Sequence, residues 1–243
     1  MSNLASSLVE NFVFVLQFLG IVLLMFFIAY GAEKYFKRKS GSKERILSTR
    51  KIAVIGMFSA IATVLHVLDF PLPFAPDFYK LDFSELPALI GAFAFGPVAG
   101  VMIEFCKIVL KLMFKGTSTA FVGDLANFII GCSFVLPASL IYEYRKNKKM
   151  AILGCLVGSV IMIIFGTMFN AVYLLPKFAV LYGMDLEQII GFGTMINPAI
   201  SNITTFVVFA VAPLNVVKSA SVSILTLLLY KKLSPILKQS MVK

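Results

Sequence analysis

The sequence predicts an all-α membrane protein with one membrane domain, and three observations support this fold class. Hydrophobic residues make up 59% of the 243 residues and charged residues only 14%, against about 25% charged residues in an average soluble domain. Uncharged runs of the length that a bilayer-spanning helix needs, about 20 residues, fill most of the chain. The Lys and Arg residues gather beside these runs in three short clusters, at 33–51, 145–149 and 231–243.

These clusters set the predicted topology, because basic residues flank membrane helices on the cytoplasmic side. Together they hold sixteen of the 22 Lys and Arg residues. The net charge of +10 therefore does not indicate a nucleic-acid partner, which would require a basic folded surface with aromatic residues for base stacking. We expect a multi-pass protein of the cell (plasma) membrane, with the N-terminus outside and the C-terminus in the cytoplasm.

The first half of the chain is expected to begin with two spans. The first, 11–32, ends at a basic cluster and lacks the positive start of a signal peptide, so we expect it to be retained. The second, 52–68, runs outward to a loop at 69–85, where three prolines prevent regular helix. A short hairpin follows, broken at Gly96-Pro97; its two arms are 86–96 and 97–114.

The second half is expected to contain three more spans, which makes seven in all. Residues 125–143 and 150–175 lie on either side of the cluster at 145–149, and Pro176 ends the second of them. Residues 177–193 form an outer connection. The apolar run at 194–230 is too long for one straight span, so we expect Pro198 and Pro213 to break it. The predicted parts are a re-entrant or outer segment at 194–212 and a final inward helix at 213–230.

Ionisable residues inside a bilayer are costly, so each is a candidate functional residue. Glu104, Lys107 and Lys111 share one helix face by their spacing. They form either a structural ion pair or the polar wall of a binding cavity.

Asn215 and Lys218 are three residues apart, so their side chains lie on neighbouring faces of one turn. An amide offers a donor and an acceptor, and an ammonium adds a strong donor. The pair therefore suits the edge of a heterocycle that carries carbonyl groups and a ring N–H. The alternative for Lys218 is a side chain that extends to the membrane surface.

Each of the other polar residues has two possible roles. Asn170, near Tyr173 at the outer end of its span, either contacts a ligand or bonds across helices, and for Asn127 we favour the second role. Asp82 either caps a helix or contacts a ligand. The aromatic residues of the loop either cover a planar ligand or form an interfacial belt; they are Phe70, Phe74, Phe78, Tyr79 and Phe83.

Several kinds of site are not expected. His66 is the single histidine, and neither it nor the three cysteines has metal-ligand spacing. The sequence lacks a GxxxxGK[ST] phosphate loop and a GxSxG nucleophile, so we expect no metal, no bound cofactor and no catalytic residue. Gly56 and Ala60, four residues apart, form a small-residue face suited to contact with another helix.

Six segments in a fixed order carry a family resemblance. They are LDFPLPF at 68–74, LDFSELPALIGAFAFGPVAGV at 81–101, IEFCK at 103–107, LANFIIG at 125–131, NAVYLLP at 170–176 and PLNVVK at 213–218. Together they resemble the riboflavin-specific S component, the substrate-binding membrane subunit of energy-coupling factor (ECF) transporters. The resemblance implies a six-helix S-component bundle at 49–243, preceded by an additional N-terminal transmembrane helix and basic linker at 1–48.

The resemblance also implies a function. Riboflavin would be captured outside the cell and delivered inward with a transmembrane T component and two ATPase subunits, the chain itself being no enzyme. By this resemblance, the flavin ring would be bound by Asn170, Asn215 and Lys218. The loop with Leu81 and Asp82 would close over the ring. The helix with Gly56 and Ala60 would contact the T component. From the residue arguments above, the candidate substrate-binding set also includes Tyr173, Glu104 and Lys107.

Some positions depart from the family pattern, and two alternatives stay open. Ile108 and Asp69 stand where the family tends to have Asn, and the segment at 177–212 is longer than usual. One alternative is an S component for another flavin, such as FMN, or another vitamin, such as a thiamine-like one. The other is an intramembrane enzyme that uses Glu104 and His66, which we disfavour because no second catalytic partner stands at usable spacing.

Overall fold

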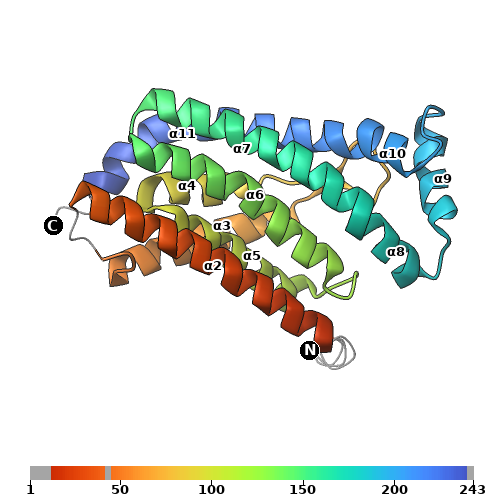
Figure 1. Ribbon diagram of the computed structural model, residues 1–243, viewed down its shortest axis with the longest axis horizontal. Coiled ribbons are helices and arrows are strands. Elements are labelled where there is room, and N and C mark those ends of the chain that lie inside the picture. The colour runs from red at the N-terminus through yellow and green to blue at the C-terminus, as the bar shows by residue number, and fades with distance from the viewer. Residues whose placement is uncertain (1–11, 42–44, 240–243) are drawn as a thin grey trace.

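A computed structural model describes residues 12–41 and 45–239, which form an elongated bundle of helices (Figure 1). The all-α membrane fold class is confirmed. The helices are α2 (Phe12–Ser40), α3 (Thr49–Val67), α4 (Glu85–Phe95), α5 (Pro97–Lys115), α6 (Val122–Tyr144), α7 (Lys148–Phe169), α8 (Leu175–Tyr182), α9 (Leu186–Ile196), α10 (Ile203–Phe206) and α11 (Ala212–Gln239), with two π-helical turns, η1 (Asn170–Leu174) and η2 (Val207–Val211).

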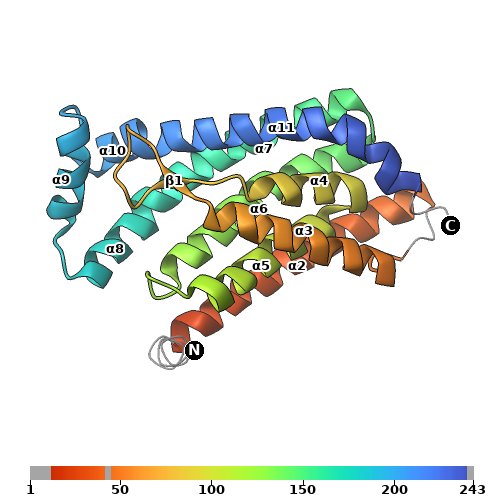
Figure 2. The same cartoon turned by 180° about the vertical axis from the view of Figure 1, so that it is seen from behind.

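Most helices run along the length of the bundle (Figures 1 and 2). The helix α2 packs along α5 and α6, while α7 packs against both α6 and α11. The α6–α7 turn and the C-terminal end of α2 lie at one end, and α8, α9 and the long loop before α4 lie toward the other. The described residues of two basic clusters, those at 33–51 and 145–149, are thereby brought to the same end.

Among the described residues, five helical segments are long and apolar enough to cross a membrane. Their bounds are Phe12–Ser40, Thr49–Val67, Val122–Tyr144, Lys148–Tyr182 and Ile203–Tyr230. The predicted hairpin is also present, as the short helix α4 and the charged helix α5. Its break lies at Gly96, as expected, where a φ of +107° is a conformation open to glycine and unfavourable for other residues.

The first helix is longer than predicted and is fixed to the hairpin. It ends at Ser40 rather than at residue 32, and its buried Glu33 accepts a hydrogen bond from the Val98 N–H at 3.2 Å. A Cβ at Gly96 would lie 2.6 Å from the Glu33 carboxylate, so only glycine leaves room for this contact. A carboxylate at the N-terminus of α5 also interacts favourably with the helix dipole.

Two predicted helix breaks are wrong. The chain continues through Pro176 to Tyr182, and the last span begins at Ile203 rather than at Pro213. A proline inside a helix lacks an N–H and clashes with the preceding turn. Here a π-helical turn precedes each proline, η1 before Pro176 and η2 before Pro213, and the wider turn lets the helix continue. The predicted outer connection at 177–193 and the segment at 194–212 accordingly contain parts of α8, α9, α10 and η2.

The proline-rich loop is non-helical, as expected, and folds back over the bundle. Its two ends pair as a minimal antiparallel hairpin, β1 (Phe70–Pro71) with β2 (Lys80–Leu81). Tyr79, Leu81 and Asp82 are buried, so the end of the loop is part of the protein interior. This placement brings Tyr79 against η1, Phe78 against α8 and Asp82 against α11.

Candidate functional site

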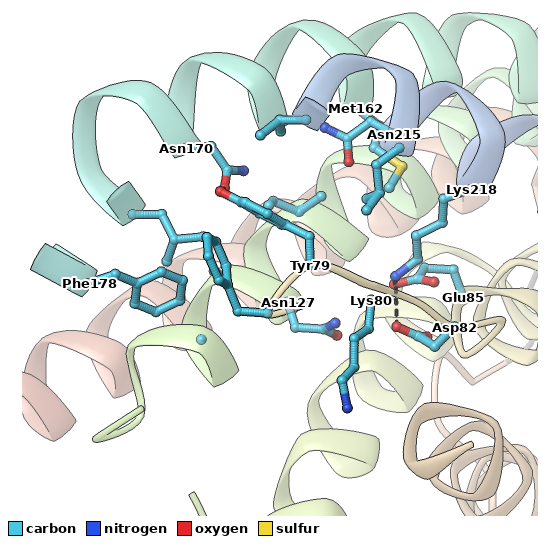
Figure 3. A pocket seen from close by; sticks show the side chains of 17 residues that line it. Tyr79, Lys80, Asp82, Glu85, Asn127, Met162, Asn170, Phe178, Asn215 and Lys218 are labelled. Atoms are coloured by element: carbon cyan, nitrogen blue, oxygen red, sulfur yellow. Dashed lines mark hydrogen bonds and ion pairs between the residues drawn. The ribbon is translucent and has the colours of Figure 1, made fainter. Parts of the chain in front are cut away.

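A cavity of about 160 Å³ lies where the loop meets α4, α6, the α7–α8 rod and α11 (Figure 3). Its polar lining residues are Tyr79, Lys80, Asp82, Glu85, Asn127, Asn170, Asn215 and Lys218, and its apolar wall includes Met162 and Phe178. Both π-helical turns border it. Asn170 is the first residue of η1, and Asn215 lies one turn after η2; π-turns occur often at functional sites.

Asn170 has both ends of its amide engaged within the protein. The Tyr79 hydroxyl donates to Asn170 Oδ1 at 2.6 Å, and Asn170 Nδ2 donates to the Gly166 carbonyl at 2.7 Å. Burial raises the pKa of the Tyr79 phenol, so the hydroxyl stays protonated and acts as the donor. In this state the Tyr79 ring occupies part of the cavity beside Asn170 (Figure 3).

Asn215 lies opposite, with a donor that has no partner. Its side chain is 3% exposed, and Nδ2 makes no hydrogen bond. A Cβ at Gly166 would come within 2.8 Å of this nitrogen, so the glycine in α7 makes room for the amide. The amide nitrogen lies against α7, and the Asn215 side chain forms part of the cavity wall.

Lys218 is held by two carboxylates. Its Nζ lies 3.0 Å from Asp82 Oδ2 and 2.9 Å from Glu85 Oε1. Burial works against ionisation of Asp82, but Lys218 and His66, whose Nδ1 is 3.4 Å away, hold the pKa of that carboxyl well below its usual range. Asp82 Oδ1 also accepts the Ser84 N–H at 2.9 Å, so one residue both shapes the start of α4 and binds the lysine.

Behind this pair lies a second buried ion pair. Lys107 Nζ lies 2.7 Å from Glu104 Oε2 and 3.3 Å from Glu85 Oε1, and it donates to Ser84 Oγ at 2.8 Å. Neither Glu104 nor Lys107 has any exposed surface. A Cβ at Gly131 would lie 2.5 Å from Glu104 Oε2, so the glycine in α6 provides the space. The two ion pairs therefore form one row of alternating charges, in the order Glu104, Lys107, Glu85, Lys218 and Asp82.

The predicted site residues divide into two groups. Asp82, Asn170, Asn215 and Lys218 line the cavity together, although they come from three distant parts of the chain. The others do not line it: Leu81 is buried beside it, Glu104 and Lys107 lie behind it, and Tyr173 faces a separate cavity between α2, α6 and η1.

Sequence reasoning missed four of the polar residues that line the cavity. Tyr79 stood out only as one of several loop aromatics, Asn127 as a packing residue and Glu85 as the last residue of the proline-rich loop, while Lys80 was not singled out. The spacing of the buried charges in α4, α5 and α11 was the signal that could have pointed to Glu85, because two buried lysines need nearby carboxylates.

The small-residue face of α3 points away from the bundle. Gly56 and Ala60 are exposed, and nothing lies within 4 Å of a Cβ placed at Gly56. Over the part of the chain that the structure covers, no group of three or more His, Cys, Asp or Glu side chains could hold a metal ion.

A model of the family described as "ECF transporter, substrate-specific component" matches residues 50–230. The riboflavin transporter RibU of Staphylococcus aureus (strain TCH60) is 36% identical over 81% of this chain and 97% of its own length. The riboflavin transporter FmnP of Bacillus subtilis (strain 168) is 33% identical over 79% and 96%. A solved S component of a bacterial ECF transporter superposes with a TM-score of 0.61 at 33% identity, over 78% of this chain and 98% of that one.

Proposed function

The chain belongs to the substrate-specific components of ECF transporters, and from this premise we propose that it binds riboflavin outside the cell for import. The observation that carries the proposal is one buried cavity lined by Asn170, Asn215 and Lys218. The free amide donor and the ammonium suit the carbonyl groups on the pyrimidine edge of a flavin. Relatives that align over nearly their whole length are named riboflavin transporters.

The basic clusters indicate from which side of the membrane the ligand is captured. The basic clusters at 33–51 and 145–149 mark the cytoplasmic end. The helix α8 and the loop before α4, which both contribute residues to the cavity, lie toward the opposite end of the bundle (Figure 1). The cavity therefore opens to the outside, where the loop over 69–84 covers it. The C-terminus is cytoplasmic and the N-terminus external.

Partner subunits would supply the energy. The chain binds and releases ligand without chemical conversion, while a T component and two ATPase subunits drive delivery. The exposed face with Gly56 and Ala60 is where the T component would dock, because small residues allow two helices to approach closely. The region 49–243 forms the transport core, with 1–48 as an added helix and linker.

A panel of vitamins tests the substrate class. Ligands that bind only the folded state raise its stability by mass action. The purified protein in detergent should melt at a higher temperature with riboflavin, and at an unchanged temperature with thiamine or biotin. Protection by thiamine or biotin instead of riboflavin would contradict the proposed substrate while leaving the family assignment intact.

The covering loop must move when riboflavin binds. Small-molecule sites usually have volumes of about 300 Å³ or more, whereas this cavity has about 160 Å³, partly because the Tyr79 ring fills it. Its hydrogen bond to Asn170 has to break first.

We therefore expect Tyr79→Phe to bind riboflavin more tightly, by roughly 2- to 10-fold, because a neutral hydrogen bond contributes about 0.5–1.5 kcal/mol. Equilibrium titration by quenching of flavin fluorescence measures the change, with Phe74→Leu in the same loop as the control. Weaker binding by Tyr79→Phe would show that the phenol contacts the ligand instead of competing with it.

A second observation favours FMN as an additional substrate. An adjoining cavity of about 420 Å³ shares Lys80 and Asn127 with the first, and it is also lined by Lys111 and Lys115. Lys111 pairs with Asp124 at 2.6 Å, but Lys80 and Lys115 share the single carboxylate of Asp69, at 3.2 and 3.7 Å. The excess positive charge suits a phosphate at the end of the ribityl chain.

We expect FMN affinity to fall by several-fold between low and high salt, while riboflavin affinity changes little, because salt screens exposed charges. Lys115→Gln should reduce the salt dependence for FMN and leave riboflavin binding unchanged. Equal salt dependence for both ligands would argue against a phosphate position among these lysines.

A further inference from the structure

A second cavity lies between the additional helix α2 and the transport core. It has a volume of about 450 Å³, and its lining comes from α2, α6, α7 and η1. It lies along the N-terminal half of α2, toward the end of the bundle that carries α8 (Figure 1). Among the described residues that line it, none is charged: Gln17 and Tyr173 supply the polar atoms, and the others are apolar residues and Gly20.

The cavity is open on the side of α2. Gln17, Gly20 and Leu24 follow one another on one helix face, at spacings of three and four residues, and all three are exposed. A Cβ placed at Gly20 would meet nothing within 4 Å, so the missing side chain leaves open space. The facing wall is aromatic, because the Phe169 ring stacks on Tyr173 with the ring centroids 5.1 Å apart.

Two helices place this cavity at the same depth in the membrane. The hydrocarbon core of a bilayer is about 30 Å thick, which a helix crosses in about 20 residues. Lys37, at the basic end of α2, follows Gln17 by 20 residues, and Tyr173 follows Met150, directly after the second basic cluster, by 23 residues. Gln17 and Tyr173 therefore both lie near the edge of the hydrocarbon, in the leaflet opposite the basic clusters. Leu24 lies about 10 Å deeper.

We propose that this cavity binds one acyl chain of a phospholipid from that leaflet. The cavity opens onto hydrocarbon, and an empty apolar space of this size would deprive its lining of dispersion contacts. At the hydrocarbon edge, where tyrosine is typical, the Gln17 amide and the Tyr173 hydroxyl can donate hydrogen bonds to the ester carbonyls of the lipid. The uncharged lining indicates that the chain is recognised and not a charged head group.

The bound chain would pack behind the wall of the ligand cavity. Tyr173 and Asn170 belong to the same π-turn, η1, but line different cavities, and so do the neighbours Ile129 and Ile130 of α6. The additional helix and the lipid chain therefore cover the reverse side of two elements that contribute to the ligand cavity.

Quenching of tryptophan fluorescence by brominated lipid tests the proposal in a bilayer. The sequence contains no tryptophan, so Phe169→Trp places a single reporter in the cavity wall. The protein is reconstituted in dioleoylphosphatidylcholine vesicles in which an increasing share of the lipid carries bromine part-way along one acyl chain. We expect strong quenching, and the addition of Gly20→Phe should remove most of it, because the new ring fills the open side of the cavity.

Gly31→Phe is the matched control. Gly31 is also an exposed glycine of α2 with nothing within 4 Å of an added Cβ, but it does not line the cavity. This substitution should leave the quenching unchanged, and a thermal transition shows that each variant is folded. Equal quenching with and without Gly20→Phe would overturn the inference, and so would weak quenching of the Phe169→Trp reporter itself.

The head group provides a further test. Brominated phosphatidylglycerol and brominated phosphatidylcholine should quench the reporter equally in the same host vesicles, because the described lining residues carry no charge. Much stronger quenching by the anionic lipid would overturn the assignment of the cavity to an acyl chain.

Discussion

Lys218→Met is expected to weaken riboflavin binding by roughly 10- to 100-fold. A buried ammonium that donates to a ligand carbonyl contributes a charge-assisted hydrogen bond, and methionine replaces the stem without the donor. The substitution also leaves Asp82 and Glu85, at 3.0 and 2.9 Å from the lost nitrogen, without their shared cation. Fluorescence titration of the purified protein measures the loss.

Two controls separate binding from folding. Lys177→Met removes an exposed lysine of the nearby helix α8 and should leave the affinity unchanged. Asn215→Ala removes a donor that has no partner inside the protein. It should weaken riboflavin binding by about 10-fold. The melting temperature of the ligand-free protein should not fall. Wild-type affinity in Lys218→Met would contradict the assigned role of this lysine.

Lys107→Met should cause the largest loss of stability. Lys107 is fully buried against Glu104, Glu85 and Ser84, and removal of one partner of a buried ion pair costs about 3–5 kcal/mol. For a chain of this size, that corresponds to a decrease in melting temperature on the order of 10 °C. Thermal unfolding in detergent, without ligand, measures it.

A second substitution tests the cause. When Glu104→Leu is added to Lys107→Met, the unpaired carboxylate is removed as well, and part of the lost stability should return. Lys115→Met is the control for loss of a lysine from the same helix. Its side chain is 48% exposed and lies 3.7 Å from Asp69, so its loss should change the melting temperature little. An unchanged melting temperature in Lys107→Met would contradict a stabilising role for the buried ion pair.

The transmembrane organisation could be predicted because hydrophobic length and basic flanks act locally along the chain. Four of the predicted spans, at 11–32, 52–68, 125–143 and 150–175, correspond to α2, α3, α6 and α7. The break at Gly96-Pro97 was also visible, since glycine and proline are local signals.

The helix breaks at Pro176 and Pro213 were predicted wrongly because a proline has two possible consequences. It ends a helix when nothing relieves the clash with the preceding turn, and it is tolerated when a wider turn precedes it. The two wider turns, η1 and η2, contact each other in the folded protein. The common spacing, one residue between each π-turn and its proline, becomes meaningful only once the structure is known.

The site was partly predictable for a related reason. Asn170, Asn215 and Lys218 stood out because polar side chains inside apolar helices are costly and therefore conspicuous. Tyr79 and Glu85 did not, because they lie in or beside a loop outside the apolar helices, where aromatic and charged residues are ordinary. Their importance comes from folding of that loop into the bundle, which places Tyr79 against Asn170 and Glu85 against Lys218.

The most direct measurement is an equilibrium titration of the purified wild-type protein with riboflavin, after bound flavin has been removed and its absorbance recorded. We expect saturable, stoichiometric quenching of flavin fluorescence that ATP does not change, because this chain alone carries the binding cavity. A preparation that is colourless and does not quench riboflavin fluorescence, while folded by its thermal transition, would contradict the central claim that this cavity binds riboflavin.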